Sequence, residues 1–347
     1  MTTLTVSTSK PYDIKIGRGS LEQTGSYMAS IFDPCKVAVL TDSIVDGYYA
    51  DSLLAQLRAN GFSADKILFP GGEHSKNAGT YVNILEALAA DGLSRSDVIL
   101  ALGGGVVSDL AGFVAGTYLR GLPYVVVPTT FQGAIDAAIG GKTGINLNSG
   151  KNLAGVIWQP SLVVCDPDTF QTLPAATMLD GIAEAVKYAV ISEASLIDKI
   201  LAGDYAYVLE RCVSIKKSLV EVDERDRGLR HILNFGHTIG HGIEKLTSYR
   251  ISHGRAVAKG MIAESLGAYR TGLAPRDISG DLSDLLEALG FDVSLTYDAS
   301  RLCQLALNDK KIAEGKITMI IPESIGKCHL KKLALDELFE LITAGVF

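Results

Sequence analysis

The chain has 347 residues, of which 47% are hydrophobic and 20% are charged. A chain of this length usually needs two hydrophobic cores, and the composition is that of a globular protein, which excludes the disordered and fibrous classes. The net charge of −7 argues against nucleic acid as a partner.

The predicted elements of the first half alternate between short apolar strands and amphipathic helices. In chain order they are the strand 36–42, the helix 47–61, the strand 66–70, the helix 77–92, the strand 97–105, a helix from about Ser108 and the strand 123–130. Strands that alternate with helices are typical of a doubly wound parallel sheet with helices on both faces. We therefore predict an α/β domain at residues 1–165.

Helical periodicity dominates the second half. The predicted helices are 172–191, 205–226, 232–246, 255–272 and 279–291, and one strand is predicted at 316–322. We therefore predict a mainly α-helical domain at residues 166–347. Because no low-complexity linker separates the halves, a ligand site at the interface of the two domains is expected.

The start of the chain lacks the features of a signal peptide, and no apolar run is long enough to cross a bilayer. The five cysteines are scattered and form no CxxC pair, which is typical of reduced, structural thiols. These features predict a cytoplasmic protein without a membrane partner.

Glycine-rich segments follow several predicted strands. Residues 100–112, LALGGGVVSDLAG, place three glycines between a strand and a helix, where free N–H groups attract phosphate. The GxGxxG fingerprint is absent, and a plain tight turn would explain the glycines alone. However, residues 70–76, residues 127–130 and Asp42 also follow predicted strands, where open parallel sheets bind ligands. Together these segments predict a nucleotide site.

Histidines gather in the second half. His237 and His241 share one face of a predicted helix, and His253 lies near the start of the next. Upstream, Glu184 and Lys187 are three residues apart on another predicted helix. One carboxylate and two imidazoles could hold zinc and leave a position open for substrate. The alternative is a surface ion pair and ordinary polar histidines, since H-x-x-x-H is common by chance, and the spacing does not decide between them.

Several basic and amide side chains occur in glycine-rich or apolar surroundings. Most lysines are solvated surface charges, but these surroundings are less typical of plain surface. As a set they suit a small substrate that carries both phosphate and carboxylate. They are Lys142, Lys151, Asn152, Lys216, Arg230, Asn234, Lys310 and Lys311.

A series of motifs resembles the 3-dehydroquinate synthase family from about residue 36 to residue 330. In order, they are GGGVVSDLAGF, TYLRG, PTT, GGKTGIN, GKNL, TLP, AEAVKY, DERDRGLRHILNFGHTIGH, HGRAVAKGM and DKK. The resemblance implies an NAD-binding α/β domain followed by a helical domain, with the active site between them, in a homodimer.

The resemblance also implies the cofactor contacts. It implies a zinc ion, with cobalt as an alternative, held by Glu184, His237 and His253, which leaves His241 as a site residue and not a ligand. The implied NAD contacts are Asp42, Gly71, Gly72, Glu73, His74, Ser75, Lys76, Gly105, Val106, Val107, Ser108, Asp109, Thr129, Thr130, Lys142, Lys151, Thr169, Phe170, Gln171 and Thr172.

The implied substrate is 3-deoxy-D-arabino-heptulosonate 7-phosphate, a phosphorylated sugar acid of the shikimate pathway to aromatic amino acids. A carbon–oxygen lyase of this family makes 3-dehydroquinate and phosphate by transient oxidation with NAD, phosphate elimination, reduction and aldol closure. The implied substrate contacts are Lys142, Asn152, Asn234, His241, one of Lys310 or Lys311, and a second subunit's Arg120 for the phosphate, Lys216 and Arg230 for the carboxylate, and Asp136 and Lys187 for the hydroxyls.

The chain departs from the family pattern at a few positions. Ser108 replaces a usual glycine, where it could cap a helix, Ala137 and Ala138 replace usual serines, and Arg255 replaces a usual glutamate. An alternative is therefore another sugar phosphate cyclase, of the amino-dehydroquinate, inosose or valiolone type. A metal-dependent polyol dehydrogenase and a non-catalytic relative are further alternatives.

Overall fold

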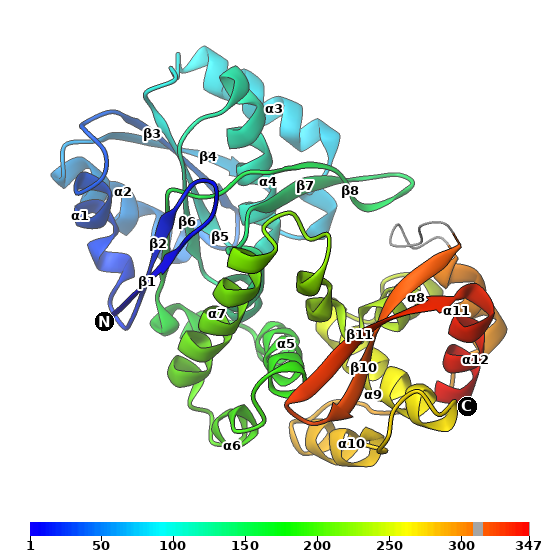
Figure 1. Ribbon diagram of the computed structural model, residues 1–347. Helices are drawn as coiled ribbons and strands as arrows, with labels where there is room; N and C mark the ends of the chain where they lie inside the picture. The colour runs from blue at the N-terminus through cyan, green and yellow to red at the C-terminus, as the bar shows by residue number, and fades with distance from the viewer. Residues whose placement is uncertain (308–314, 347) are drawn as a thin grey trace. The chain divides into compact units, whose positions relative to one another are not determined.

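The computed structural model describes residues 1–307 and 315–346. They form two compact units (Figure 1): a first unit of Met1–Pro174 and Lys216–Arg225, and a second unit of Ala175–Ile215 and Asp226–Phe347. The first unit thus extends beyond residue 165, where the sequence analysis divides the chain. It also takes in the end of a later helix, because the chain passes from the second unit to the first inside α7 (Tyr205–Val222).

The first unit contains a seven-stranded sheet in the order β1-β2-β9-β6-β5-β3-β4. Every neighbouring pair is parallel except β1 and β2. The doubly wound parallel sheet predicted from the sequence is confirmed. The strands are β1 (Thr2–Val6), β2 (Tyr12–Ile16), β3 (Lys36–Asp42), β4 (Ser63–Phe69), β5 (Val98–Gly103), β6 (Tyr124–Pro128) and β9 (Leu162–Cys165).

The central strands are continuous apolar runs because helices cover both of their faces. Alternate side chains of β3 and β5 pack in one core with α2 (Asp51–Ala59) and α1 (Thr24–Ala29). Helix α4 (Gly105–Thr117) packs on β5 and β6, and α3 (Ala78–Ala90) packs beside α4. A separate antiparallel hairpin, β7 (Lys142–Leu147) and β8 (Gly150–Ile157), packs against α4.

The start of α4 corrects one prediction. The helix begins at Gly105, three residues before the expected start near Ser108. Ser108 therefore lies inside the first turn, and its hydroxyl donates to the Gly105 carbonyl at 3.1 Å. The expectation that Ser108 caps the helix is wrong.

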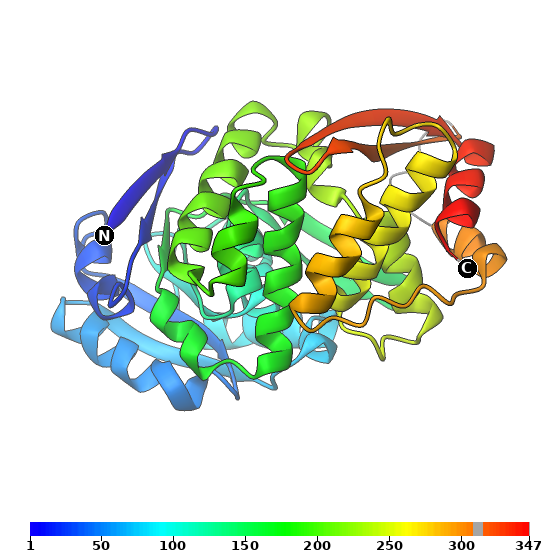
Figure 2. The ribbon, with the colours of Figure 1, turned by 90° about the horizontal axis from the view of Figure 1, so that it is seen from below.

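The second unit is mainly α-helical, as predicted. An antiparallel ribbon of β10 (Lys316–Ser324) and β11 (Lys327–Ala334) runs along its helices (Figure 2). The helices are α5 (Ala175–Ile191), α6 (Leu196–Leu201), the first part of α7, α8 (His237–Leu246), α9 (His253–Arg270), α10 (Ser279–Ala288), α11 (Ala299–Ala306) and α12 (Leu335–Gly345). None of the helices within residues 1–307 and 315–346 has the length and apolar character needed to span a membrane.

Glycines bring α8 and α9 into close contact. A side-chain carbon on Gly260 would lie 2.0 Å from the Gly236 carbonyl oxygen, and one on Gly240 would lie 3.0 Å from the Ala256 carbonyl oxygen. Gly236 itself has φ 75°, which glycine adopts at little cost. The backbones of the two helices therefore approach more closely than larger residues would allow.

This contact predicts a position-specific effect on stability. Gly260→Ala should lower the free energy of unfolding by about 1–3 kcal/mol, because the added methyl group overpacks the contact. Gly280→Ala, on α10, is the matched control, since no atom lies within 4 Å of the added carbon. Urea unfolding of both variants measures the difference, and equal values would contradict the close approach of α8 and α9.

Candidate active site

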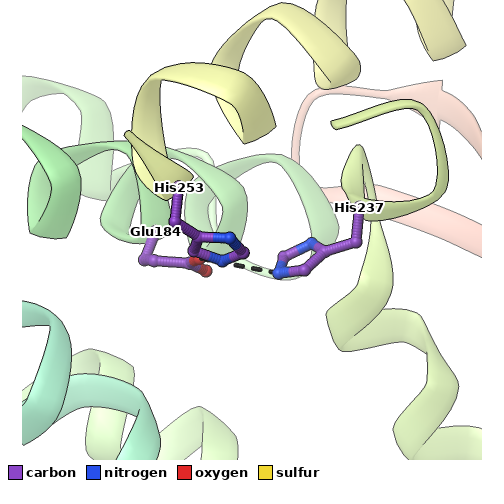
Figure 3. Close-up of side chains that lie close together, drawn as sticks. All are labelled: Glu184, His237 and His253. Atoms are coloured by element: carbon purple, nitrogen blue, oxygen red, sulfur yellow. Dashed lines mark ion pairs between the residues drawn. The ribbon is translucent and has the colours of Figure 1, made fainter. Parts of the chain in front are cut away.

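Three side chains from separate helices converge in the second unit (Figure 3). Glu184 lies on α5, while His237 and His253 are the first residues of α8 and α9. The Glu184 Oε1 atom lies 3.3 Å from His253 Nε2 and 3.6 Å from His237 Nε2. Because zinc–ligand bonds are about 2.0–2.2 Å long, neighbouring ligands of a tetrahedral ion lie about 3.3–3.6 Å apart. The observed spacing therefore suits one divalent cation.

The Glu184 carboxylate provides a further test of this fit. Its side chain is completely buried, and Oε1 makes no hydrogen bond within the described part of the chain. A buried carboxylate oxygen without a donor is costly unless a positive charge compensates it. Two imidazole nitrogens and a buried carboxylate oxygen are also the ligand types that zinc prefers. The residues present therefore fit a divalent metal ion.

The ionisation of the three groups is set by burial and by their neighbours. Burial alone would raise the pKa of Glu184, but the charge of Lys187 and the neighbouring His237 and His253 rings hold that pKa well below its usual range. Burial lowers the pKa of His237, which favours the neutral imidazole that a metal needs. Burial also opposes a proton on His253, but Glu184 and Glu244 raise its pKa to about 10.

The other ring nitrogen of each histidine faces an acceptor. His237 Nδ1 lies 3.0 Å from the Phe235 carbonyl oxygen, and His253 Nδ1 lies 3.4 Å from Glu244 Oε2. When each Nδ1 carries the hydrogen, it donates to these acceptors and the lone pair of Nε2 is left for a metal. The surrounding residues therefore orient both rings for metal binding.

Glu264 supports the same site, and the sequence analysis did not identify it. This fully buried carboxylate on α9 accepts from the Gly236 N–H at 2.9 Å and from the Ile320 N–H at 3.1 Å. It thereby fixes the residue that directly precedes His237. The available signal was an acidic side chain on the apolar face of a predicted helix.

His241 lies one turn after His237. The ring of His241 is 5.5 Å from that of His237 and 5.7 Å from that of His253. His241, Glu244 and His253 also lie close enough to form a second group of potential ligands. His253 belongs to both groups: its Nε2 faces Glu184 and its Nδ1 faces Glu244. The role of His241 as a site residue stays a prediction.

Three more predicted substrate residues belong to the second unit. Lys187 is buried and contacts Glu184 Oε2. Arg230 is 1% exposed and lies in η7 (Leu229–Asn234). Asn234 ends the same turn and donates to the His231 carbonyl at 3.1 Å. Their contacts with substrate stay predictions, and Lys310 and Lys311 lie outside the described residues.

The predicted nucleotide segments meet at the carboxyl ends of neighbouring strands in the first unit. Asp42 ends β3, Gly104 follows β5, and Thr129 follows β6. The strand order reverses between β3 and β5, which is where doubly wound sheets bind ligands. Asp42 Oδ1 accepts the N–H groups of Ile44 and Val45 at 2.8 and 3.0 Å and fixes the loop there.

Two observations support phosphate or nucleotide binding at this edge. Gly104 precedes α4 without a side-chain cap, so N–H groups of the first turn are open to an anion. The buried Thr129 hydroxyl has no hydrogen-bond partner among the described residues. A side-chain carbon on Gly104 would lie 2.9 Å from Thr130 Cγ2, so a larger residue would crowd Thr130 there. The residues present fit a dinucleotide.

Lys76 contacts a predicted NAD-binding residue, Asp109, and a predicted substrate-binding residue, Asn152. Its buried ammonium lies 2.5 Å from Asp109 Oδ2 and 2.5 Å from Asn152 Oδ1. Burial raises the pKa of Asp109, and the charge of Lys76 opposes this shift. Asn146 adds a bond to Glu73 Oε1 at 2.6 Å. The 71–76 loop is therefore held to α4 and to the β7–β8 hairpin.

Lys216 and Asp136 form an ion pair with each other. The buried ammonium of Lys216 contacts both the carboxylate and the carbonyl oxygen of Asp136. The resemblance implies separate roles for them, with the substrate carboxylate and a hydroxyl. Both roles stay predictions, and the structure adds that each group is balanced by the other.

The remaining predicted contacts of the first unit are also placed. Lys142 and Arg120 are exposed, and Arg120 has φ 69°. Lys151 lies on β8, and Thr169 to Thr172 lie in η6 (Pro167–Thr172). The Tyr49 hydroxyl, which the sequence analysis did not identify, is 2.6 Å from Thr172 Oγ1.

Comparison with solved structures extends these observations. The chain is 28% identical to a 2-deoxy-scyllo-inosose synthase complexed with carbaglucose-6-phosphate, NAD⁺ and Co²⁺, with a TM-score of 0.87 over 98% of this chain and 99% of that one. It is 27% identical to a 2-epi-5-epi-valiolone synthase from Streptomyces hygroscopicus with NAD⁺ and Zn²⁺ bound, with a TM-score of 0.86 over 99% of this chain and 98% of that one. A glycerol dehydrogenase from Schizosaccharomyces pombe, 18% identical with a TM-score of 0.68, shares the fold.

Together, the fold and the site place the chain in the class of sugar phosphate cyclases. Residues 66–180 match the N-terminal domain and residues 181–312 the C-terminal domain of 3-dehydroquinate synthase. The chain is 38% identical to the 3-dehydroquinate synthase of Streptococcus suis over 96% of this chain and 97% of that one. It is 40% identical to that of Enterococcus faecalis over 94% of each. The chain belongs to the 3-dehydroquinate synthase family.

The orientation of His253 predicts an effect on metal affinity. Glu244→Ala should weaken cobalt binding about 10–100-fold, because His253 loses the acceptor that orients its ring. Glu244→Gln, which keeps an oxygen acceptor, should lose less. Competition with a chelating dye measures the dissociation constant, and Glu287→Ala on exposed α10 surface is the control. Unchanged affinity in Glu244→Ala would contradict the orienting role.

Proposed function

We propose that the chain converts 3-deoxy-D-arabino-heptulosonate 7-phosphate into 3-dehydroquinate and phosphate, with NAD and a zinc or cobalt ion as cofactors. The observation that carries this proposal is the convergence of Glu184, His237 and His253 on one position, in a chain of the 3-dehydroquinate synthase family. NAD would supply reversible hydride transfer at a substrate hydroxyl carbon, and the cation would supply positive charge at its oxygen.

The residues of the chain bind and orient these groups. Glu184, His237 and His253 hold the cation, and their contacts with Lys187, the Phe235 carbonyl and Glu244 keep the ligand atoms directed at it. The first turn of α4 and the Thr129 hydroxyl bind the dinucleotide, and Asp42 fixes the neighbouring loop. The protein thus contributes orientation and charge, since the reaction has no net redox change.

The substrate carries a carboxylate and a phosphate, and we assign to each a set of cationic or hydrogen-bond-donating side chains. Lys216 and Arg230 are both buried, and a substrate carboxylate is a suitable partner for buried cations. In the absence of substrate the Asp136 carboxylate balances Lys216. The phosphate is bound by Lys142, Asn152, Asn234, His241, Arg120 of the partner subunit, and Lys310 or Lys311.

A second candidate is a cyclase whose substrate lacks the carboxylate. The likeness to 2-deoxy-scyllo-inosose and 2-epi-5-epi-valiolone synthases, at TM-scores of 0.87 and 0.86, favours it. The higher identities of 38–40% to 3-dehydroquinate synthases favour the first candidate.

We also propose a cytoplasmic homodimer. Leu153 and Ile157 are 46% and 41% exposed on one face of β8, and Leu119 is 39% exposed. A side-chain carbon on Gly121 would lie 2.4 Å from the Trp158 ring, so the turn that carries Leu119 lies beside the end of β8. These apolar side chains suit contact with a second copy. The free cysteines suit a reducing compartment.

Phosphate release by the purified chain tests the activity. With the heptulosonate phosphate and catalytic NAD we expect phosphate release without lasting NADH absorbance, and loss of release when a chelator removes the metal. Turnover of sedoheptulose phosphate or glucose phosphate in its place would support the second candidate. NADH that accumulates in proportion to an alcohol substrate would show a dehydrogenase and contradict both candidates.

A further inference from the structure

Asp180 lies on α5, one helical turn before the metal-site residue Glu184. Its Oδ1 atom accepts a hydrogen bond from the Ser252 hydroxyl at 2.6 Å and another from the Arg255 N–H at 3.3 Å. Ser252 directly precedes α9, whose first residue is His253, and Arg255 is the third residue of that helix. One carboxylate on α5 therefore holds the beginning of α9 from both sides of His253.

This contact replaces the usual cap of α9. The third N–H group of a helix normally bonds to the side chain of the residue before the helix. Ser252 occupies that position, yet it makes no capping bond to its own helix and donates to Asp180 instead. Arg255 is the third residue of α9, so Asp180 supplies the missing acceptor from a different helix. A negative charge at this end also suits the helix dipole.

Gly254 shows how closely the two helices meet. A side-chain carbon on Gly254 would lie 2.4 Å from Asp180 Cα and 2.5 Å from the Asp180 carbonyl oxygen. The backbone of α9 therefore rests directly on the backbone of α5 at the residue after His253. This contact and the two hydrogen bonds are independent observations of the same junction.

We propose that Asp180 is a positioning residue that sets the distance between Glu184 and His253 and so preassembles the metal site. This inference rests on the proposed function of the metal site. Glu184 is carried by α5 and His253 by the first turn of α9, so the 3.3 Å between Oε1 and Nε2 depends on how α9 is placed on α5. Metal–ligand distances tolerate shifts of only about 0.2 Å. The junction at Asp180 is a direct link between the two elements next to both ligands.

Asp180 and Glu244 act on His253 in different ways. Glu244 faces the ring and sets its rotation, whereas Asp180 holds the backbone on each side of the residue. Asp180 makes no contact with the imidazole rings or with the Glu184 carboxylate among the described contacts. Its loss should therefore reduce metal affinity by displacing the helix start, and not by removing a ligand.

The test is the cobalt dissociation constant of the full-length protein, measured by competition with a chelating dye, together with the visible spectrum of bound cobalt. Asp180→Ala should raise the dissociation constant about 10–100-fold and shift the spectrum, as the loss of other supporting residues at metal sites does. Asp180→Asn, which keeps an oxygen acceptor, should restore most of the affinity.

Asp277→Ala is the matched control. Asp277 Oδ1 also accepts one N–H and one hydroxyl, both from Ser279, at the start of α10. Its loss should lower the melting temperature of the metal-free protein about as much as Asp180→Ala does, since each removes the side-chain acceptor of one N–H group at the start of a helix. Cobalt affinity should stay at the wild-type value. If cobalt binding weakened equally in both variants, the lower affinity would be explained by lower stability of the whole protein, and the inference would be overturned.

Gly254→Ala tests the same junction without touching Asp180. Alanine favours a helix more than glycine does, so the change suits α9 itself but forces it away from α5. We expect weaker cobalt binding with a shifted spectrum. Wild-type affinity in both Asp180→Ala and Gly254→Ala would overturn the positioning role alone, whereas failure of the wild-type protein to bind cobalt would overturn the proposed function as well.

Discussion

The buried carboxylate of Glu184 is the constraint on which the second unit depends. A fully buried negative charge needs compensation, and here Lys187 contacts one oxygen while two imidazole nitrogens face the other. Much of the surrounding structure keeps this arrangement in place. Glu264 holds the residue before His237, Glu244 faces the ring of His253, and Asp180 holds the start of α9. The site is thus a set of helix ends fixed by acidic side chains, of which Glu244 and Glu264 are buried.

In the proposed function, the first unit binds an anionic cofactor although the protein has a net charge of −7. The groups available for this are the backbone N–H groups at the start of α4, which need no positive side chain. Its buried cations are neutralised within the unit, Lys76 by Asp109 and Lys216 by Asp136. These charged side chains therefore hold segments of the first unit together, in addition to their proposed role in ligand binding.

Local patterns predicted much of the fold but not its polar contacts. The apolar runs of β3, β5 and β6 were recognisable because these strands are buried on both faces. The hairpins β1–β2 and β7–β8 were missed, since β1 is short and β8 is largely exposed and rich in glycine. The predicted start of α4 is wrong because the helix begins inside the run of three glycines, a residue of low helix propensity.

The same limit applies to the site. The spacing of histidines and the family motifs indicated Glu184, His237 and His253, and these three converge. No periodicity could show that Asp180 reaches Ser252, 72 residues later, or that Lys216 pairs with Asp136, 80 residues earlier. Such pairs depend on how helices pack, which is a property of the folded chain.

The most direct test of the account is the number of divalent cations bound per chain, measured by equilibrium dialysis for the wild-type protein and for His253→Ala. His329→Ala, which alters a histidine on β11 that is 43% exposed, is the control. The account predicts one tightly bound ion in the wild-type and control proteins, and loss of that ion together with activity in His253→Ala. Full metal content with normal turnover in His253→Ala would contradict it.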